Sequence, residues 1–370
     1  MKSLPFSLHP QTVYLEILYS CNLSCEYCYI GKDSNHKSPT IGSKESIFKI
    51  LQKLKEEGTQ EIVLLGGEPT IHPQFQEICE KIAELKFTSK GIVTNGTLLS
   101  SELVRTLKRC DFWVDISFRS GNQAIFDKIT AKNGSFEKCI SAAKLCSDEG
   151  IHLGIEYDCS RYNYNSLYET ILMLKDYGII LNQIQLHRIL PEGDALESQQ
   201  SLILSLQEWE EVFSQAQKIK QDLNIPIAFE DGFPYCLVDR KYWDLLVPCA
   251  CGYTLITINP LGDVRYCACY KADLGNIFTT PLSEIWEASL RDYRMIENHP
   301  LPCQECLLVE TCRSGCSVSG LNRGSNKDFF SEQFRSIKDL EDYSIPDLKL
   351  IIGQKIVSQN AKNISDKEQI

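Results

Sequence analysis

Two hydrophobic periods alternate along the first 230 residues of the chain. Short apolar or alternating runs predict buried strands, and apolar residues recurring every third or fourth position between them predict helices packed by one face. The predicted strands are Thr12–Tyr19, Glu61–Leu65, Gly91–Thr97, Asp111–Phe118, Ile151–Tyr157 and Leu181–Leu186. The predicted helices are Ser43–Glu57, His72–Leu85, Ser101–Lys108, Phe126–Ile129, Phe136–Glu149, Tyr164–Tyr177 and Leu202–Leu223.

This alternation predicts an α/β protein built from βαβ units with a parallel sheet. Six units are too few to close an eight-stranded barrel, so we expect a curved, open, partial (β/α)6 TIM-like barrel. Pro226–Tyr235 predicts a strand and turn, and a hairpin around residues 260–262 predicts a smaller, cysteine-rich α+β part. We therefore expect a barrel over residues 1–230, a cysteine-rich domain over 231–325 and a helical tail over 326–370.

Composition narrows the class of protein. The 370 residues include 17 cysteines and carry a net charge of −11. The N-terminus lacks the apolar run of a signal peptide, and no stretch has the length of a transmembrane helix. We expect a cytoplasmic chain with reduced, metal-binding cysteines. The negative charge argues against a general nucleic-acid binder, so neither nucleic acid nor a membrane is an expected partner.

Three cysteines, Cys21, Cys25 and Cys28, follow the first predicted strand with the spacing C-x3-C-x2-C. Thiolates in such a loop hold iron–sulfur clusters. Three ligands would leave one iron of a cubane open to a substrate or cofactor, like the open position of a catalytic zinc. A zinc knuckle or chance clustering is the alternative, since spacing alone seldom identifies a metal. The carboxyl end of a parallel strand is a common ligand site.

A glycine loop, Gly66-Gly67-Glu68-Pro69, follows the second predicted strand. Glycines let the backbone approach a ligand closely. The cysteine triad followed by Tyr29, together with this loop, resembles the radical S-adenosylmethionine (SAM) superfamily. That resemblance implies a partial barrel, and a [4Fe–4S] cluster at Cys21, Cys25 and Cys28 that binds SAM through its open iron.

The same resemblance implies which residues contact SAM. The loop from Gly66 to Pro69 is expected to bind the methionine amino group. The other expected SAM contacts are Tyr27, Thr94, Asn95 and Ser117. Asn95 followed by a glycine also fits a simple tight turn. Arg119, after the fourth predicted strand, has no assigned role.

A second cysteine field begins near residue 249. Its members are Cys249, Cys251, Cys267, Cys269, Cys303, Cys306, Cys312 and Cys316. A zinc ribbon usually has two separated C-x2-C pairs, which these unequal gaps do not match, so iron–sulfur clusters are favoured over zinc. The field resembles the SPASM domain, which implies one or two auxiliary [4Fe–4S] clusters. By that resemblance Cys251, Cys267 and Cys316 hold the first, with Cys249 a candidate fourth ligand, and Cys303, Cys306 and Cys312 hold the second.

The chain departs from the SPASM pattern because no cysteine follows Cys316. Three hypotheses remain: Cys269 replaces the missing ligand, the iron is open or bound by a carboxylate such as Glu332, or only one auxiliary cluster forms. The scattered cysteines are predicted to fill the hydrophobic core, with Cys236 the one that lies near the second field. They are Cys79, Cys110, Cys139, Cys146, Cys159 and Cys236.

The resemblance implies reductive cleavage of SAM to a 5′-deoxyadenosyl radical and oxidative modification, such as cross-linking, of a ribosomally synthesised peptide. Alternatives are maturation of a protein side chain of the sulfatase type, haem or cofactor biosynthesis, and a non-catalytic iron–sulfur electron carrier. Expected partners are a peptide or protein substrate and an electron donor such as flavodoxin or ferredoxin. Because little chain precedes Thr12, a separate leader-binding protein is a further expected partner. The sequence nominates no catalytic base; Asp231 and Asp263 are not distinctive enough.

Overall fold

The computed structural model describes residues 2–31, 40–191, 193, 199–270, 272–323 and 327–334. Most of the predicted helical tail, 326–370, therefore lies outside the described residues.

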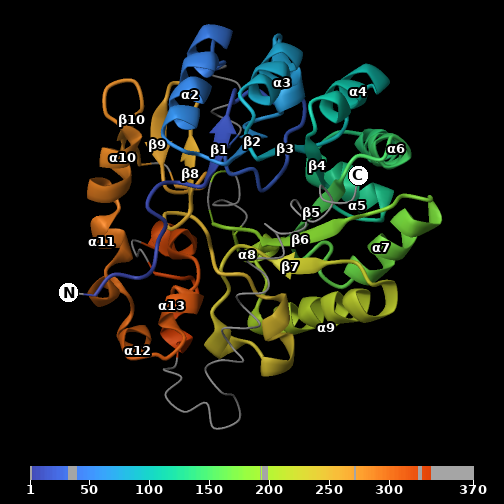
Figure 1. Ribbon diagram of the computed structural model, residues 1–370. Helices are drawn as coiled ribbons and strands as arrows, with labels where there is room; N and C mark the ends of the chain where they lie inside the picture. Colours follow the sequence, from blue (N-terminus) through green and yellow to red (C-terminus); the bar gives the residue numbers. More distant parts are fainter. Residues whose placement is uncertain are drawn as a thin grey trace, which may run out of the picture.

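One ten-stranded sheet organises the molecule, in the order β10-β9-β8-β1-β2-β3-β4-β5-β6-β7 (Figure 1). The strands are β1 Thr12–Glu16, β2 Glu61–Leu65, β3 Ser89–Thr94, β4 Trp113–Ser117, β5 Leu153–Cys159, β6 Gln183–Arg188, β7 Ile227–Phe229, β8 Leu255–Ile258, β9 Asp263–Arg265 and β10 Gly275–Asn276. Strands β1 to β7 pair in parallel with their chain neighbours. The sheet ends at β7 and β10, so the predicted open α/β barrel is confirmed, with β7 as a short seventh parallel strand.

Helices line the outer side of the curved sheet (Figure 1). They are α2 Lys44–Glu56, α3 Phe75–Glu84, α4 Ser101–Arg109, α5 Gln123–Thr130, α6 Ser135–Asp148, α7 Leu167–Asp176 and α9 Leu206–Leu223. Each of these buries an apolar face; α2, for example, buries Ile47, Ile50, Leu51 and Leu54. The apolar positions that recur every 3.6 residues and predicted these helices are thus the positions that pack against the sheet. The short helix α8, Gln199–Leu202, instead packs Leu202 into a small cluster with Tyr27 and Ile129.

The cysteine-rich part extends the barrel sheet instead of forming a detached domain. Strand β8 lies parallel beside β1, with Thr12 opposite Leu255, and β9 and β10 add antiparallel. The short α-helices that follow are α10 Leu282–Glu284, α11 Arg291–Arg294, α12 Leu301–Gln304 and α13 Val309–Cys312. Trp286, in the π-helical turn Ile285–Ser289, is fully buried and anchors this part to the N-terminal segment by donating to the Ser7 carbonyl.

The bounds of several predicted elements differ in the structure, and for two of them the contacts show the cause. The first strand stops at Glu16 rather than Tyr19, because the chain there turns into the cysteine loop. The predicted helix over 202–223 is divided, and α9 begins after Ser205. The Ser205 hydroxyl and the Glu208 carboxylate form a reciprocal capping box, which satisfies backbone donors at the start of a helix.

Candidate active site and iron–sulfur centres

The cysteine loop lies at the carboxyl end of β1. Its backbone is fastened to the end of α5, where the N–H groups of Ser24 and Glu26 donate to the carbonyls of Thr130 and Ile129. Cys21, Cys25 and Cys28 are half-buried. Burial raises the pKa of Cys21 to about 11 and that of Cys25 to about 12, so both are neutral thiols until a cation displaces their protons. Soft, cationic iron is such a partner.

The glycine loop packs directly on the backbone that leads into the cysteine loop. A Cβ on Gly66 would lie 2.1 Å from the Leu18 carbonyl oxygen, and one on Gly67 would lie 2.0 Å from that of Ser20. Gly66 also has a φ of +131°. The N–H groups of Gly67 and Glu68 donate to the Leu18 and Ser20 carbonyls, at 2.9 Å each. These glycines thus permit a close backbone approach, and the two N–H groups are already engaged.

Glu68 joins the glycine loop to the loop after β3. Its buried carboxylate accepts from the Thr70 hydroxyl at 2.6 Å, the Thr94 hydroxyl at 2.7 Å and the Asn95 backbone N–H at 2.7 Å. Burial raises the pKa of Glu68, and these hydrogen bonds oppose that rise. Because Thr94 and Asn95 are bonded to Glu68, the structure brings three of the predicted SAM contacts together.

The Asn95 side chain reaches from β3 to the cysteine loop. Its Nδ2 donates to Asn22 Oδ1 at 2.9 Å and lies 3.8 Å from Cys21 Sγ. Its Oδ1 accepts from the backbone N–H of Thr97 at 2.9 Å, which is the tight-turn geometry expected before a glycine. Both interpretations of Asn95 are therefore compatible: it forms a turn and also lies beside the triad. SAM contact by Thr94 and Asn95 stays a prediction.

Tyr27 lies beside Arg119, and Ser117 ends β4 two residues before Arg119. The Arg119 guanidinium lies 5.3 Å from the Tyr27 ring centroid and forms an ion pair with Asp158. Within the described residues, the buried Tyr27 hydroxyl has no hydrogen-bond partner. Ser117 is 8% exposed at the end of β4, and its side chain bonds to Glu156. Arg119, left without a role by the sequence, is thus a half-buried cation beside the cysteine loop.

A group of titratable side chains that sequence reasoning missed lies at the ends of β5 to β7. His187 Nδ1 lies 3.0 Å from Asp231 Oδ1, and its Nε2 lies 4.0 Å from Glu156 Oε1. The Asp231 carboxylate also accepts from the Arg188 N–H at 2.7 Å. Burial alone would lower the pKa of His187, but the Asp231 carboxylate and its hydrogen bond raise it to about 10. The available signal in the sequence was a histidine and acidic residues at alternate strand positions. Because these residues are far apart in the sequence, that signal did not show which of them pair.

A first group of C-terminal thiols comprises Cys249, Cys251, Cys267, Cys269 and Cys316. Cys251 is hydrogen-bonded to the thiols of Cys249 and Cys267, and Cys267 is hydrogen-bonded to that of Cys269. Hydrogen bonds from Cys251 and Cys269 hold the pKa of Cys267 well below its usual value. The N–H of Cys316 donates at 2.8 Å to Asp328, whose carboxylate pairs with buried Arg188 of β6. This group is therefore anchored to the barrel.

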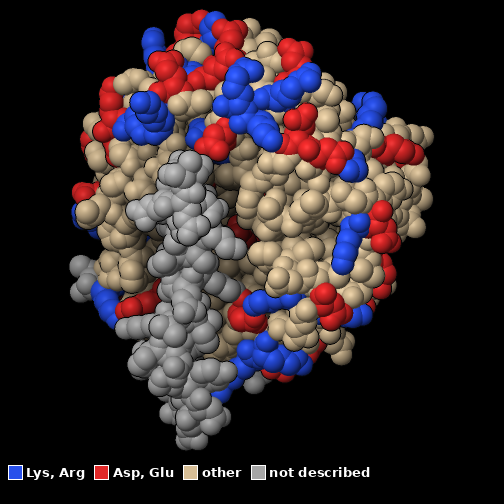
Figure 2. Space-filling model, turned by 45° about the vertical axis from the view of Figure 1, so that its right-hand side comes forward, with Lys and Arg blue, Asp and Glu red and all other residues tan. Residues whose placement is uncertain are grey.

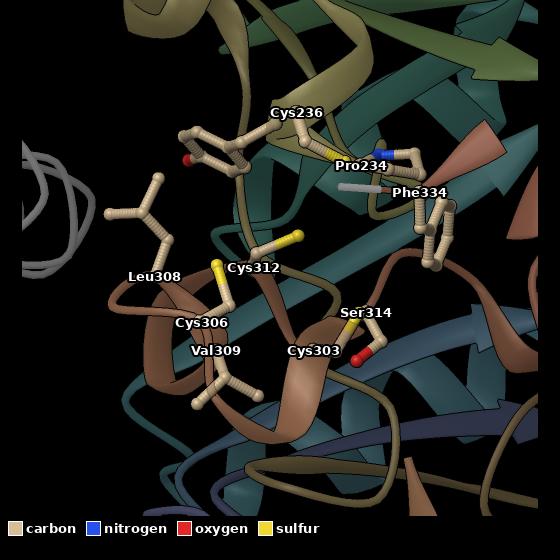
Figure 3. Close-up of a pocket in the computed structure, with 10 residues that line it drawn as sticks. Pro234, Cys236, Cys303, Cys306, Leu308, Val309, Cys312, Ser314 and Phe334 are labelled. Carbon is tan, nitrogen blue, oxygen red and sulfur yellow. The ribbon is translucent and has the colours of Figure 1, made fainter. Parts of the chain in front are cut away.

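A second group of thiols surrounds a small pocket (Figure 3). Cys303, Cys306 and Cys312 line it, as does Cys236, which the sequence assigned to core filling. Burial raises the pKa of Cys303 to about 11 and that of Cys312 to about 12. The other scattered cysteines, Cys79, Cys110, Cys139, Cys146 and Cys159, are buried in the barrel core.

These donor sets suit clusters better than single ions. None of the 17 cysteines forms a disulfide. In the part of the chain that the structure describes, no three His, Cys, Asp or Glu side chains converge closely enough to hold one metal ion. Zinc would require four ligands about 2.3 Å or less from one point. Thiolates of a cubane bind different irons and stand farther apart, which fits three separate groups of thiols.

Comparison with protein families identifies both parts of the chain. The model of the radical SAM superfamily matches residues 15–174, and that of the SPASM iron–sulfur cluster-binding domain matches residues 249–307. The chain therefore combines a radical SAM domain with a SPASM domain. Its cofactors are therefore [4Fe–4S] clusters and SAM. The match begins within β1 and includes the cysteine and glycine loops, while the SPASM match includes β8 to β10 and the thiols from Cys249 to Cys306.

Named relatives share nearly the whole radical SAM–SPASM arrangement. The subtilosin biosynthesis protein AlbA of Bacillus subtilis is 27% identical over 87% of this chain and 69% of its own length. The PqqA peptide cyclase of Gluconobacter oxydans is 23% identical, with 84% and 87% covered. An AdoMet-dependent heme synthase of Nitratidesulfovibrio vulgaris is 24% identical, with 83% and 87% covered.

The fold matches that of solved radical SAM structures. SuiB of Streptococcus suis, in complex with its precursor peptide SuiA, superposes with a TM-score of 0.69 at 18% identity, covering 88% of this chain and 75% of SuiB. At this identity the likeness establishes the fold alone.

On the face shown in Figure 2, positive and negative side chains are interspersed rather than gathered into one basic patch. None of the described helices is both long and apolar enough to span a membrane.

Proposed function

We propose that this radical SAM enzyme oxidatively modifies a ribosomally synthesised peptide. The observation that carries the proposal is the arrangement of three thiol groups on one open barrel: a triad at the carboxyl end of β1 and two C-terminal groups that continue from the same sheet. A centre that starts radical chemistry is thereby combined with additional redox centres. Such a combination suits a reaction that removes electrons from its substrate.

The relatives support a peptide as the substrate. AlbA takes part in subtilosin biosynthesis, the PqqA enzyme is a peptide cyclase, and SuiB was solved with a precursor peptide. The open edge of the sheet offers an entry for an extended chain.

The positions of these residues support the following roles. Cys21, Cys25 and Cys28 hold the catalytic cluster, which leaves one iron for SAM. Gly66, Gly67, Glu68 and Pro69, with Tyr27, Thr94, Asn95 and Ser117, form the SAM-binding wall. When bound, the cluster and SAM supply a 5′-deoxyadenosyl radical that removes hydrogen from unactivated C–H bonds.

The polar group at the strand ends orients the substrate and holds a proton. With its pKa near 10, His187 is an imidazolium at neutral pH, fixed by Asp231 at 3.0 Å. Half-buried Arg119 supplies a second cation beside Tyr27. Both cations would attract a carboxylate or a backbone carbonyl of a bound molecule and exclude apolar groups from this side of the barrel.

Cys249, Cys251, Cys267, Cys269, Cys303, Cys306, Cys312 and Cys316 are the proposed ligands of the auxiliary clusters, which would supply sites for single-electron transfer. An electron donor such as flavodoxin or ferredoxin, a separate leader-binding protein and a cytoplasmic location remain parts of the proposal. The division into parts 1–230, 231–325 and 326–370 is also part of the proposal. The two family matches fall within the first two of these parts.

Haem biosynthesis is the second candidate, because a heme synthase is similar over as much of the chain as the peptide cyclase. Anaerobic assays distinguish the two. The reconstituted protein, given SAM and dithionite, is expected to form 5′-deoxyadenosine, and Cys21→Ala is expected to form none.

The substrate assay then uses small peptides encoded next to the gene, with iron-bound tetrapyrroles as the competing substrates. A modified peptide that has lost hydrogen, seen by mass spectrometry, supports the proposal. Turnover of a tetrapyrrole without change to any peptide would contradict it.

A further inference from the structure

Four thiols rather than three line the pocket of the second C-terminal group. Cys303, Cys306 and Cys312 come from the segment around α12 and α13, and Cys236 comes from the opposite side of the pocket (Figure 3). We propose that Cys236 is the fourth protein ligand of the second auxiliary cluster, in place of the cysteine that is missing after Cys316.

The segment that carries Cys236 is held in place. Cys236 lies in the 3-10 turn Tyr235–Leu237, shortly after β7. The Trp243 indole donates to the carbonyls of Tyr235 and Val238 at 3.2 and 3.0 Å. The backbone N–H of Tyr235 bonds to the Cys312 thiol, which connects this turn directly to the cysteine run. The position of Cys236 is therefore set by the same contacts that set Cys312.

The chemistry of the pocket suits a closed cubane. Four thiolates give each iron one protein ligand, and soft sulfur ligands are those that iron–sulfur clusters require. Much of the remaining wall is apolar and includes Leu308, Val309 and Phe334. An apolar wall excludes water from a cluster, which protects it from hydrolysis and tunes its reduction potential. A cluster with four cysteine ligands has no open iron, so this site would transfer electrons rather than bind substrate.

The geometry also separates Cys236 from the two other candidates. Cys269 is hydrogen-bonded to Cys267 and so belongs to the first group. Glu332 is exposed and does not line the pocket, although Phe334 does. With Cys236 assigned here, the first group still has five thiols, which is enough for its own cubane.

Ligation is measured without any substrate or turnover. The test protein carries Cys21→Ala, Cys25→Ala and Cys28→Ala, so that only auxiliary clusters are counted after anaerobic reconstitution. In this background, Cys236→Ala and Cys303→Ala are each expected either to remove about four irons per chain or to convert one cluster to a three-iron form seen by electron paramagnetic resonance. Cys159→Ala, a buried barrel cysteine, is the matched control and is expected to change neither reading. Unchanged iron and unchanged spectra in Cys236→Ala would overturn the proposal.

A second measurement keeps the test decisive if Cys236→Ala does not fold. The unmutated, reconstituted protein is treated anaerobically with iodoacetamide, and labelled cysteines are located by mass spectrometry before and after iron chelation. Cys236 is expected to be protected together with Cys303, Cys306 and Cys312 and to become labelled after chelation. Labelling of Cys236 in loaded protein, at the rate seen after chelation, would refute its role as a ligand. Neither experiment depends on the peptide substrate, so a failure of the proposed function leaves this result intact.

Discussion

The cysteine loop after β1 and the pocket around Cys236 hold thiols in opposite surroundings. The loop has three half-buried thiols beside a polar network that includes Glu68, Asn95 and Arg119. The pocket has four thiols within a largely apolar wall. Three ligands leave an iron available for SAM, whereas four ligands close a cluster. The number of thiols and the polarity around them therefore distinguish a centre that binds a cofactor from one suited to electron transfer.

The largest expected effect is the loss of SAM cleavage. It is expected from a change in the cysteine loop but not from a change in the pocket around Cys236. Cys25→Ala removes a ligand of the open cluster and is expected to abolish 5′-deoxyadenosine formation, because SAM then has no complete cluster to bind. Cys306→Ala is expected to keep SAM cleavage while reducing iron content and formation of modified peptide. The measurement is anaerobic chromatography of 5′-deoxyadenosine together with iron analysis. Equal loss of SAM cleavage in both variants would remove the distinction.

A buried ion pair beside the cysteine loop makes the stability of the fold sensitive to the loss of a single charge. Arg265 of β9 pairs with fully buried Glu16 of β1, which also accepts from the hydroxyls of Tyr19 and Tyr29. Arg265→Met is expected to lower the free energy of unfolding by about 3–5 kcal/mol, because it leaves a buried carboxylate without its cation. Denaturant titration of the reconstituted protein measures this.

Two companion variants control for loss of charge in general. The double variant Glu16→Gln/Arg265→Met is expected to recover part of that stability, because neither charge remains. Arg109→Met, which breaks an exposed pair with Glu80, is expected to cost less than about 1 kcal/mol. A similar cost for Arg265→Met and Arg109→Met would show that the pair between β1 and β9 is not an anchor.

The glycine loop should tolerate a methyl group less well than other turns. Gly67→Ala places a Cβ against the Ser20 carbonyl oxygen, so the cysteine loop must shift, at an expected cost of about 2 kcal/mol or more. Thermal unfolding and the affinity for SAM are the measurements. Gly134→Ala is the control: its Cβ meets nothing closer than 4.0 Å, and its φ of +77° costs about 1 kcal/mol. Equal destabilisation by both variants would contradict the close packing of the two loops.

The smallest expected effect is a dependence of stability on pH that comes from His187. The folded state raises the pKa of His187 from 6.5 to about 10. The stabilisation that its charge provides is therefore fully present below pH 6.5 and is lost as the pH rises through 10. The stability difference between the unmutated protein and His187→Gln is expected to shrink across this range in denaturant titrations. A difference that does not change with pH would mean that folding does not raise the pKa of His187.

Sequence reasoning succeeded where the signal is local. The hydrophobic period located the strands and helices of the barrel, and the glycine loop follows β2 as expected. Sequence reasoning was less accurate where an element boundary depends on a helix cap, as at Ser205, or where a strand is followed by a loop, as after Glu16. For the predicted SAM contacts, the sequence named Glu68, Thr94 and Asn95 separately. The structure shows that they share hydrogen bonds.

The sequence by itself determined the fold class, the cysteine triad and the presence of a second cysteine field, because periodicity and motif spacing are properties of neighbouring residues. Only the tertiary structure brought His187 to Asp231 and Cys236 to Cys303, Cys306 and Cys312. These partners are separated by tens of residues, and no repeat or spacing relates them. Their proximity depends on how β7 and the turn after it pack against the SPASM domain, and that packing is set by the whole hydrophobic core.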